Sequence, residues 1–187
     1  GGAAADAAAV LVGLNELFGV GLSEGDLRGI GVRIGADVPF CISGGTALGE
    51  GIGERLTPLP APPDHRLLLL KPKSSAETAE VYRAYDERPG HPGPVEPTLK
   101  ALWVGDLESL AASLNNDLAS TTRNFVSVVA EYEKNLLEKG ALGACMSGTG
   151  TAVYGMFENE DDIPRKAGTE APFSGVFEPV PRGVLIL

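Results

Sequence analysis

The chain has 187 residues, 43% of them hydrophobic and 21% charged, which is enough apolar material for one domain or two small ones. Its formal net charge of −10 argues against non-specific binding to nucleic acid or to an anionic membrane surface. No apolar run is long enough to span a bilayer, and no basic segment typical of a signal peptide stands at the start, so we expect a cytoplasmic protein.

The first elements in chain order are two predicted helices. Apolar residues recur at helical spacing from Val10 to Phe18, and Gly19 is a plausible stop. Ser23 can cap a second helix, because Asp26 stands three residues on in the position of a capping box. Three apolar residues are expected on the buried side of that helix: Leu27, Ile30 and Ile34.

Residues 35–60 are rich in glycine and show no helical period, so we expect short strands joined by tight turns. The prolines of PLPAPPDH at 58–65 fit neither a helix nor a sheet ladder. We therefore predict a linker there, between a domain at 1–60 and a domain at 65–187.

Beyond the linker, strand and helix patterns alternate. RLLLLKP predicts a strand buried on both faces, and residues 74–87 predict a helix capped by Ser74 or Ser75. ALGACMSGTGTAVYGMF predicts strand, glycine turn and strand, and EPVPRGVLIL predicts a final strand. Two helical faces lie between, one of Leu107, Leu110, Ala111, Leu114 and Leu118, the other of Phe125, Val129, Tyr132 and Leu136 with Gly140 at its end. This mixture predicts an α/β or α+β fold with a helix-covered sheet.

The two cysteines, Cys41 and Cys145, lack the spacing of metal ligands. Each lies in apolar or glycine-rich surroundings, which favours a small buried residue over a disulfide. We predict no protein-held metal centre, and the cysteines fit a reducing compartment.

The opening sequence GGAAAD has the residues of a phosphate cradle. Glycines directly before a helix let backbone N–H groups turn toward a ligand, and the helix dipole favours negative charge there. The same residues also fit a helix that simply starts after Gly-Gly, with alanines for helix propensity and Asp6 capping the first turn.

The segment IGADVPFCISGG contains a candidate general base. Pro39 is expected to hold Val38 extended, which would put Asp37 just past the end of a helix on backbone with little freedom. A carboxylate fixed there can accept a proton from an attacking hydroxyl, a task worth about 10²- to 10⁴-fold in rate. An aspartate bonded to nearby N–H groups of a turn is the other interpretation.

The third motif is the Ser-Gly-Thr-Gly turn in MSGTGTAVYG. Such a turn between two strands can bring the backbone very close to a ligand. It fits an ordinary hairpin turn equally well, so the motif alone does not decide between the two.

Together, the order and spacing of these motifs resemble the GHMP family of small-molecule kinases. GADVPF and GIGERL at this separation carry the resemblance, which runs from Gly1 to about Phe157. It implies an α+β fold of two domains: the C-terminal part of a domain like the second domain of ribosomal protein S5, then a ferredoxin-like kinase domain. The family's upstream strands, lysine and first half of the glycine loop have no counterpart here, so it also implies an N-terminally truncated chain.

The resemblance implies an activity: ATP- and Mg²⁺-dependent phosphorylation of a hydroxyl of a cytidine-diphosphate-linked methylerythritol, in non-mevalonate isoprenoid biosynthesis. It makes Asp37 the catalytic and substrate-contacting carboxylate, and it gives Thr78 and Tyr82 contacts with the cytidine substrate. A tyrosine there can stack on the cytosine ring, worth about 1–3 kcal/mol, or be a core aromatic. The residues implied to bind ATP are Gly1, Gly2, Ala3, Ala4, Ala5, Ser147, Gly148, Thr149 and Gly150.

One departure from the family pattern concerns the phosphate loop. Ala4 and Ala5 stand where the family has hydroxyl side chains, and a lost bond to a charged group costs about 1.5–3 kcal/mol. The backbone N–H groups and the helix dipole remain. Two alternatives stay open, a GHMP kinase of the homoserine or mevalonate type and a non-catalytic binding module.

Overall fold

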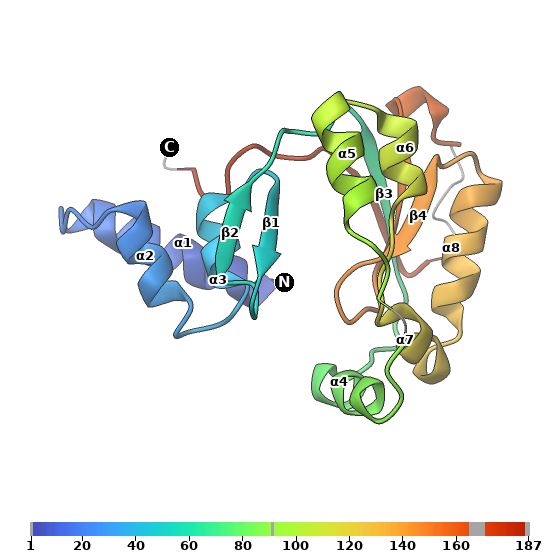
Figure 1. The fold of residues 1–187 in the computed structure, drawn as a ribbon, viewed down its shortest axis with the longest axis horizontal. Helices are drawn as coiled ribbons and strands as arrows, with labels where there is room; N and C mark the ends of the chain where they lie inside the picture. Colours follow the sequence, from blue (N-terminus) through green and yellow to red (C-terminus); the bar gives the residue numbers. More distant parts are fainter. Residues whose placement is uncertain (1, 91, 165–170, 186–187) are drawn as a thin grey trace. The chain divides into compact units, whose positions relative to one another are not determined.

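The computed structural model describes residues 2–90, 92–164 and 171–185. Contacts divide the chain into two compact units, coloured along the sequence in Figure 1. Unit 1 comprises Gly1–Ala61 and Val180–Leu187, and unit 2 comprises Pro62–Pro179. The sequence-based division instead kept residues 180–187 with the second domain.

Unit 1 contains the helices α1 (Gly2–Leu17), α2 (Glu24–Gly31) and α3 (Val38–Ser43). They pack around a small apolar cluster whose buried members are Ala8, Leu27, Val38 and Ile42. The two predicted helices are thus present, but Ile30 and Ile34 are 37% and 58% exposed. The buried residue at the end of α2 is Gly31, where a Cβ would come 2.8 Å from Val38 Cγ1, so glycine lets α3 approach closely.

The segment that follows contains a helix where only strands were expected. Pro39 lies in the first turn of α3, where a missing N–H removes no helical hydrogen bond. Val38 is therefore helical rather than extended, and Asp37 is the N-cap residue of α3 rather than a residue past a helix end. The expected strands follow as an antiparallel hairpin of β1 (Ala47–Glu50) and β2 (Arg55–Pro58).

The described part of EPVPRGVLIL forms no strand, so that prediction is wrong. Pro179 and Pro181 cannot donate to a ladder. Val184 packs against the apolar cluster of unit 1, and the backbone of Gly183 touches Gly44, which has φ +69° and no room for a side chain. This close backbone approach ties the segment to unit 1.

Unit 2 is built on an antiparallel sheet in the order β4-β5-β3-β6. Its strands are β3 (Arg66–Lys71), β4 (Gly143–Met146), β5 (Val153–Phe157) and β6 (Phe173–Phe177). β3 is internal, as its leucines suggest, but only Leu68 and Leu70 are buried, so its second face is half covered. The sequence did not predict β6, because Ser174 and Gly175 weaken the pattern and its partner is distant in the chain.

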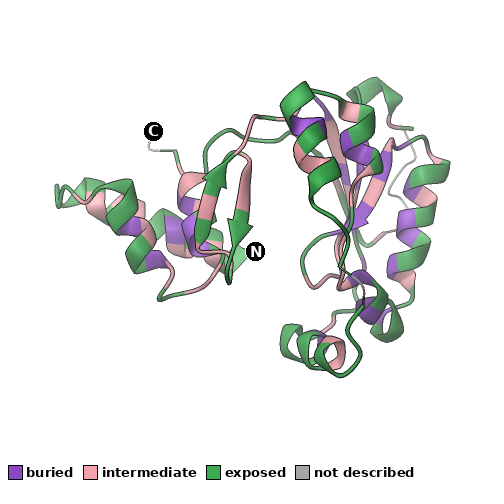
Figure 2. Cartoon of the chain, viewed as in Figure 1, coloured by how far each residue is buried: buried purple, intermediate pink, exposed green. Residues whose placement is uncertain are grey.

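Helices of unit 2 cover the sheet face that carries Leu68 and Leu70 (Figure 2). Val129, Tyr132 and Leu136 of α8 join that core. The helices are α4 (Thr78–Glu87), α5 (Glu96–Val104), α6 (Leu107–Ala112), α7 (Ala119–Phe125) and α8 (Val128–Glu138), with a 3₁₀ turn at Glu160–Asp162.

Three helix predictions need correction. The N-cap of α4 is Glu77, so neither serine caps it, and α5 was not predicted. The face expected from Leu107 to Leu118 breaks after Ala112, because Asn116 Oδ1 accepts the N–H of Leu118 and turns the chain. Among the described residues, no helix has the length and apolarity needed to cross a membrane.

The α8 core generates a stability prediction with a built-in control. Leu136 is fully buried, whereas its neighbour Leu137 is 51% exposed. We expect Leu136→Ala to lower the free energy of unfolding by about 2–5 kcal/mol, because it leaves a cavity. Leu137→Ala is expected to change it by less than about 0.5 kcal/mol. Urea titration followed by circular dichroism measures both, and equal effects would contradict the packing described.

The capping box of α2 generates a pH prediction. Ser23 donates from Oγ and from N–H to Asp26 Oδ2, at 2.6 and 3.0 Å, and these bonds hold the pKa of Asp26 below its usual value. A lowered folded-state pKa means that the stabilisation is present above the unfolded pKa and is lost as pH falls through the folded one. Ser23→Ala should raise the pKa of Asp26 in an NMR titration. The pKa of Asp106, which is lowered by hydrogen bonds from Ser109, should stay unchanged in this variant and serves as the control.

Candidate active site

The residues of the predicted phosphate loop form the first turn of α1. Gly2 begins the helix, and Ala3, Ala4 and Ala5 follow within it, so their backbone N–H groups have no partner within the helix. The first turn carries no acidic side chain. Asp6 lies beyond it, which corrects the expectation of a capping carboxylate, while Gly1 lies outside the described residues. The helix end therefore presents a positive partial charge made by backbone alone.

Asp37 lines an open pocket of about 470 Å³ in unit 1. One wall comes from the start of α3 and the other from the β1–β2 hairpin, and its residues are Ala36, Asp37, Phe40, Cys41, Ala47, Gly49, Gly53 and Leu56. Asp37 itself is exposed and adds a carboxylate to this largely apolar lining. Burial raises the pKa of the Cys41 thiol, which keeps it protonated near neutral pH and unsuited to nucleophilic attack.

The Ser-Gly-Thr-Gly motif is a tight turn between β4 and β5, as predicted. Ser147 donates its N–H to Ala152 O, and Gly150 donates to Ser147 O, each at 2.9 Å. Gly148 and Gly150 have φ of +57° and +90°, values that L side chains rarely adopt. Ser147 and Gly148 are exposed, so the tip of the turn is accessible.

Two side chains, from the α6–α7 connection and from α7, hold this turn by hydrogen bonds to its carbonyl groups. Asn116 Nδ2 donates to Met146 O and to Gly148 O, both at 2.8 Å. Thr122, fully buried on α7, donates from Oγ1 to Thr149 O at 3.0 Å. Neither residue was predicted from the sequence, and the polar run NND between two apolar helical segments is the signal that could have drawn attention to Asn116.

The predicted substrate-contacting residues lie on α4. Thr78 begins that helix, and its Oγ1 lies 3.1 Å from Thr149 Oγ1, so the structure brings these two predicted residues together within unit 2. Thr151 Oγ1 donates to Ser74 O at 2.8 Å and attaches the preceding segment to the same turn. Tyr82, one helical turn after Thr78, is 50% exposed and is not a core aromatic of this unit.

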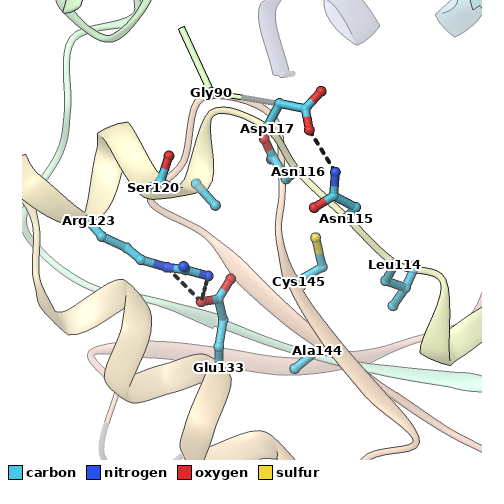
Figure 3. Close-up of a pocket in the computed structure, with 11 residues that line it drawn as sticks. Gly90, Leu114, Asn115, Asn116, Asp117, Ser120, Arg123, Glu133, Ala144 and Cys145 are labelled. Carbon is cyan, nitrogen blue, oxygen red and sulfur yellow. Dashed lines mark hydrogen bonds and ion pairs between the residues drawn. The ribbon is translucent and has the colours of Figure 1, made fainter. Parts of the chain in front are cut away.

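A second pocket in unit 2, of about 240 Å³, lies beside Asn116 (Figure 3). Its polar groups are largely paired with one another: Arg123 binds Glu133, and Asn115 donates to Asp117 Oδ1 at 2.7 Å. Burial, aided by the nearby Glu133 charge, raises the pKa of the Cys145 thiol. Because these groups satisfy each other, the pocket offers no activated nucleophile.

No group of three or more His, Cys, Asp or Glu side chains able to hold a metal occurs in the described parts of the chain. Both cysteines are free. Mg²⁺ in phosphoryl-transfer enzymes usually binds through one or two carboxylates and the substrate phosphates, not through an all-protein cage.

The sequence matches known proteins over both units. Residues 1–45 match the GHMP kinase N-terminal domain, and residues 98–168 match the GHMP kinase C-terminal region. The 4-diphosphocytidyl-2-C-methyl-D-erythritol kinase of Acetivibrio thermocellus is 44% identical over 161 residues, which cover 85% of this chain and 56% of the relative. The kinase of the same name from Moorella thermoacetica is 45% identical over 170 residues, with coverages of 89% and 60%. The chain thus spans between half and two thirds of these relatives.

Solved structures agree with these matches. A crystal structure of 4-(cytidine 5′-diphospho)-2C-methyl-D-erythritol kinase superposes with a TM-score of 0.76 at 31% identity, covering 96% of this chain and 64% of that chain. A homoserine kinase from Cytophaga hutchinsonii gives a TM-score of 0.74 at 19% identity, covering 91% of this chain and 62% of that chain, which shows the fold alone. The predicted fold class and family are confirmed, and the chain belongs to the GHMP kinase family.

Proposed function

We propose that this protein catalyses the ATP-dependent phosphorylation of a hydroxyl of 4-diphosphocytidyl-2-C-methyl-D-erythritol. The observation that carries the proposal is the identity of 39–45% to eight curated kinases of that name, over 83–89% of the chain. Homoserine and mevalonate kinases share the fold at only 19% identity, so these matches do not support homoserine or mevalonate as the acceptor. The proposed reaction belongs to isoprenoid biosynthesis and to the cytoplasm.

Each unit is proposed to supply its own ATP contacts: in unit 1 the start of α1, and in unit 2 the Ser147–Gly150 turn. Glycine and alanine at Gly2–Ala5 leave the backbone N–H groups accessible, and a helix N-terminus binds phosphate well. Mg²⁺ would enter with ATP and neutralise phosphate charge, which is the chemistry that it supplies in such enzymes. Binding is weaker than with hydroxyl side chains at Ala4 and Ala5, because each missing bond to a charged group costs about 1.5–3 kcal/mol.

The proposed general base is Asp37. Its carboxylate is exposed at the start of α3, where it can accept the proton of the acceptor hydroxyl or orient that hydroxyl toward the γ-phosphate. Phosphoryl transfer needs positioning and charge neutralisation more than covalent chemistry, and one oriented carboxylate suits that need.

The proposed cytidine contacts are Thr78 and Tyr82. Both project from α4 within one helical turn, and the half-exposed ring of Tyr82 has a face available for a base. Thr78 also touches Thr149, which links the helix to the proposed nucleotide turn. The two proposed cytidine contacts therefore depend on the position of α4.

A coupled ADP assay with the full gene product that contains these 187 residues tests the proposal. MgATP and the cytidine-linked acceptor should release ADP, and ³¹P NMR should show a new phosphomonoester. Homoserine and mevalonate serve as control acceptors and should give only background turnover. ADP release with homoserine or mevalonate but not with the cytidine-linked alcohol would contradict the assignment, as would the absence of any turnover.

Asp37→Asn is expected to lower kcat by about 10²- to 10⁴-fold, because it removes the proton acceptor and keeps the shape of the side chain. Steady-state kinetics measure the effect, with Asp64→Asn as the control at an exposed aspartate elsewhere in the chain. Loss of activity in Asp64→Asn, or full activity in Asp37→Asn, would remove Asp37 from this role.

Tyr82→Ala is expected to raise KM for the cytidine-linked acceptor about tenfold or more, since a stacking contact is worth about 1–3 kcal/mol. KM for ATP should stay near its original value. Tyr82→Phe keeps the ring and should behave like the unaltered protein. If Tyr82→Ala leaves KM for the acceptor unchanged, the ring does not bind cytidine.

A further inference from the structure

Asn116 lies between α6 and α7 and reaches across to the Ser147–Gly150 turn. Its Nδ2 donates to two carbonyls of that turn region, Met146 O and Gly148 O, each at 2.8 Å. Its Oδ1 accepts the N–H of Leu118 at 3.0 Å, which fixes the amide orientation at the start of α7. Both Nδ2–H groups and the Oδ1 of the side-chain amide are therefore hydrogen-bonded.

These bonds set the direction in which the turn presents its N–H groups. In a trans peptide the carbonyl and the following N–H point in opposite directions. Gly148 O points toward Asn116, so the N–H of Thr149 points away from it. Thr122 Oγ1 holds the next carbonyl, Thr149 O, at 3.0 Å. Two side chains behind the turn thus decide which way its backbone faces.

The turn needs such support because of its composition. Gly148 and Gly150 both have positive φ, and glycine has more backbone freedom to lose than any other residue. A Gly-Thr-Gly turn held only by its own hydrogen bonds would sample other conformations, and each fixed residue costs conformational entropy. The bonds from Asn116 favour one conformation before any ligand arrives.

We propose that Asn116 is a positioning residue for the nucleotide, which holds the Ser147–Gly150 turn in the conformation that faces ATP phosphates. The proposal rests on the proposed function for its nucleotide part. Its structural part, the fixing of the turn, stands on the hydrogen bonds alone. Asn116 does not touch the reacting atoms in this role and acts through the backbone of the turn.

The test compares Asn116→Ala and Asn116→Asp with the control Asn115→Ala. Asn115 is the adjacent residue of the same type, and its side-chain amide donates a hydrogen bond to Asp117 instead of to the turn (Figure 3). Asn116→Asp keeps the shape of the side chain but replaces the donor with an acceptor that repels both carbonyls. Amide hydrogen exchange by NMR is measured first, without nucleotide, at Ser147 and Gly150, whose N–H groups donate to Ala152 O and Ser147 O.

Exchange at the turn should accelerate at least about tenfold in both Asn116 variants and stay unchanged in Asn115→Ala, since two net hydrogen bonds are lost. In the full gene product, KM for ATP should rise about tenfold, with KM for the acceptor little changed. Unchanged exchange at the turn overturns the proposal. Faster exchange with equal rises in both KM values overturns its nucleotide part, and absence of turnover in the unaltered protein refutes the proposed function but not the fixing of the turn.

Discussion

The packing of α8 against the sheet is the constraint on which unit 2 depends. Leu136 and Ala141 occupy the space above Gly155, where an added Cβ would come 3.1 Å from either side chain. This close contact fixes the height of α8 over β5, and β5 pairs with both β3 and β4. The Ser147–Gly150 turn joins β4 to β5, and Met146 and Val153 on either side of it belong to the apolar core of unit 2. The hydrogen bonds of Asn116 and Thr122 then orient the turn between these two strands.

Local sequence patterns predicted the elements whose stabilising contacts are near in the chain. The capping box of Ser23 and Asp26 and the turn between β4 and β5 rely on neighbours within a few residues. The helical face predicted from Phe125 to Leu136 is present only within α8, because Phe125 ends α7 and is 49% exposed. The helix α3 was missed because glycine and proline together suggest turns, yet Pro39 falls in the one helical turn that tolerates it. β6 was missed because its pairing with β3 links residues far apart.

The same distinction applies to the site. Asp37 and the glycine turn were proposed as site residues through the family resemblance of their motifs, because each motif alone also fits an ordinary turn. The polar run NND could have drawn attention to Asn116 but not to its role, because the carbonyls that it bonds stand 30 and 32 residues later. The sequence was compatible with Tyr82 as a core aromatic or as a binding residue. Its 50% exposure in unit 2 shows that it is not a core residue of that unit.

An acidic protein that binds a polyanion must limit its own repulsion of that ligand. Here the net charge is −10, and the candidate phosphate-binding segments, Gly2–Ala5 and Ser147–Gly150, contain no ionisable side chain. Backbone N–H groups and the α1 dipole contribute positive potential that does not titrate, so affinity for phosphate should follow the ionisation of ATP more than that of the protein. Their field is short-ranged, whereas the surrounding carboxylates act over about 8–10 Å at moderate salt. In the proposed reaction, Mg²⁺ bound to ATP would supply the remaining charge neutralisation, and added monovalent salt, by screening the carboxylates, should oppose nucleotide binding less than it does at a lysine- or arginine-rich site.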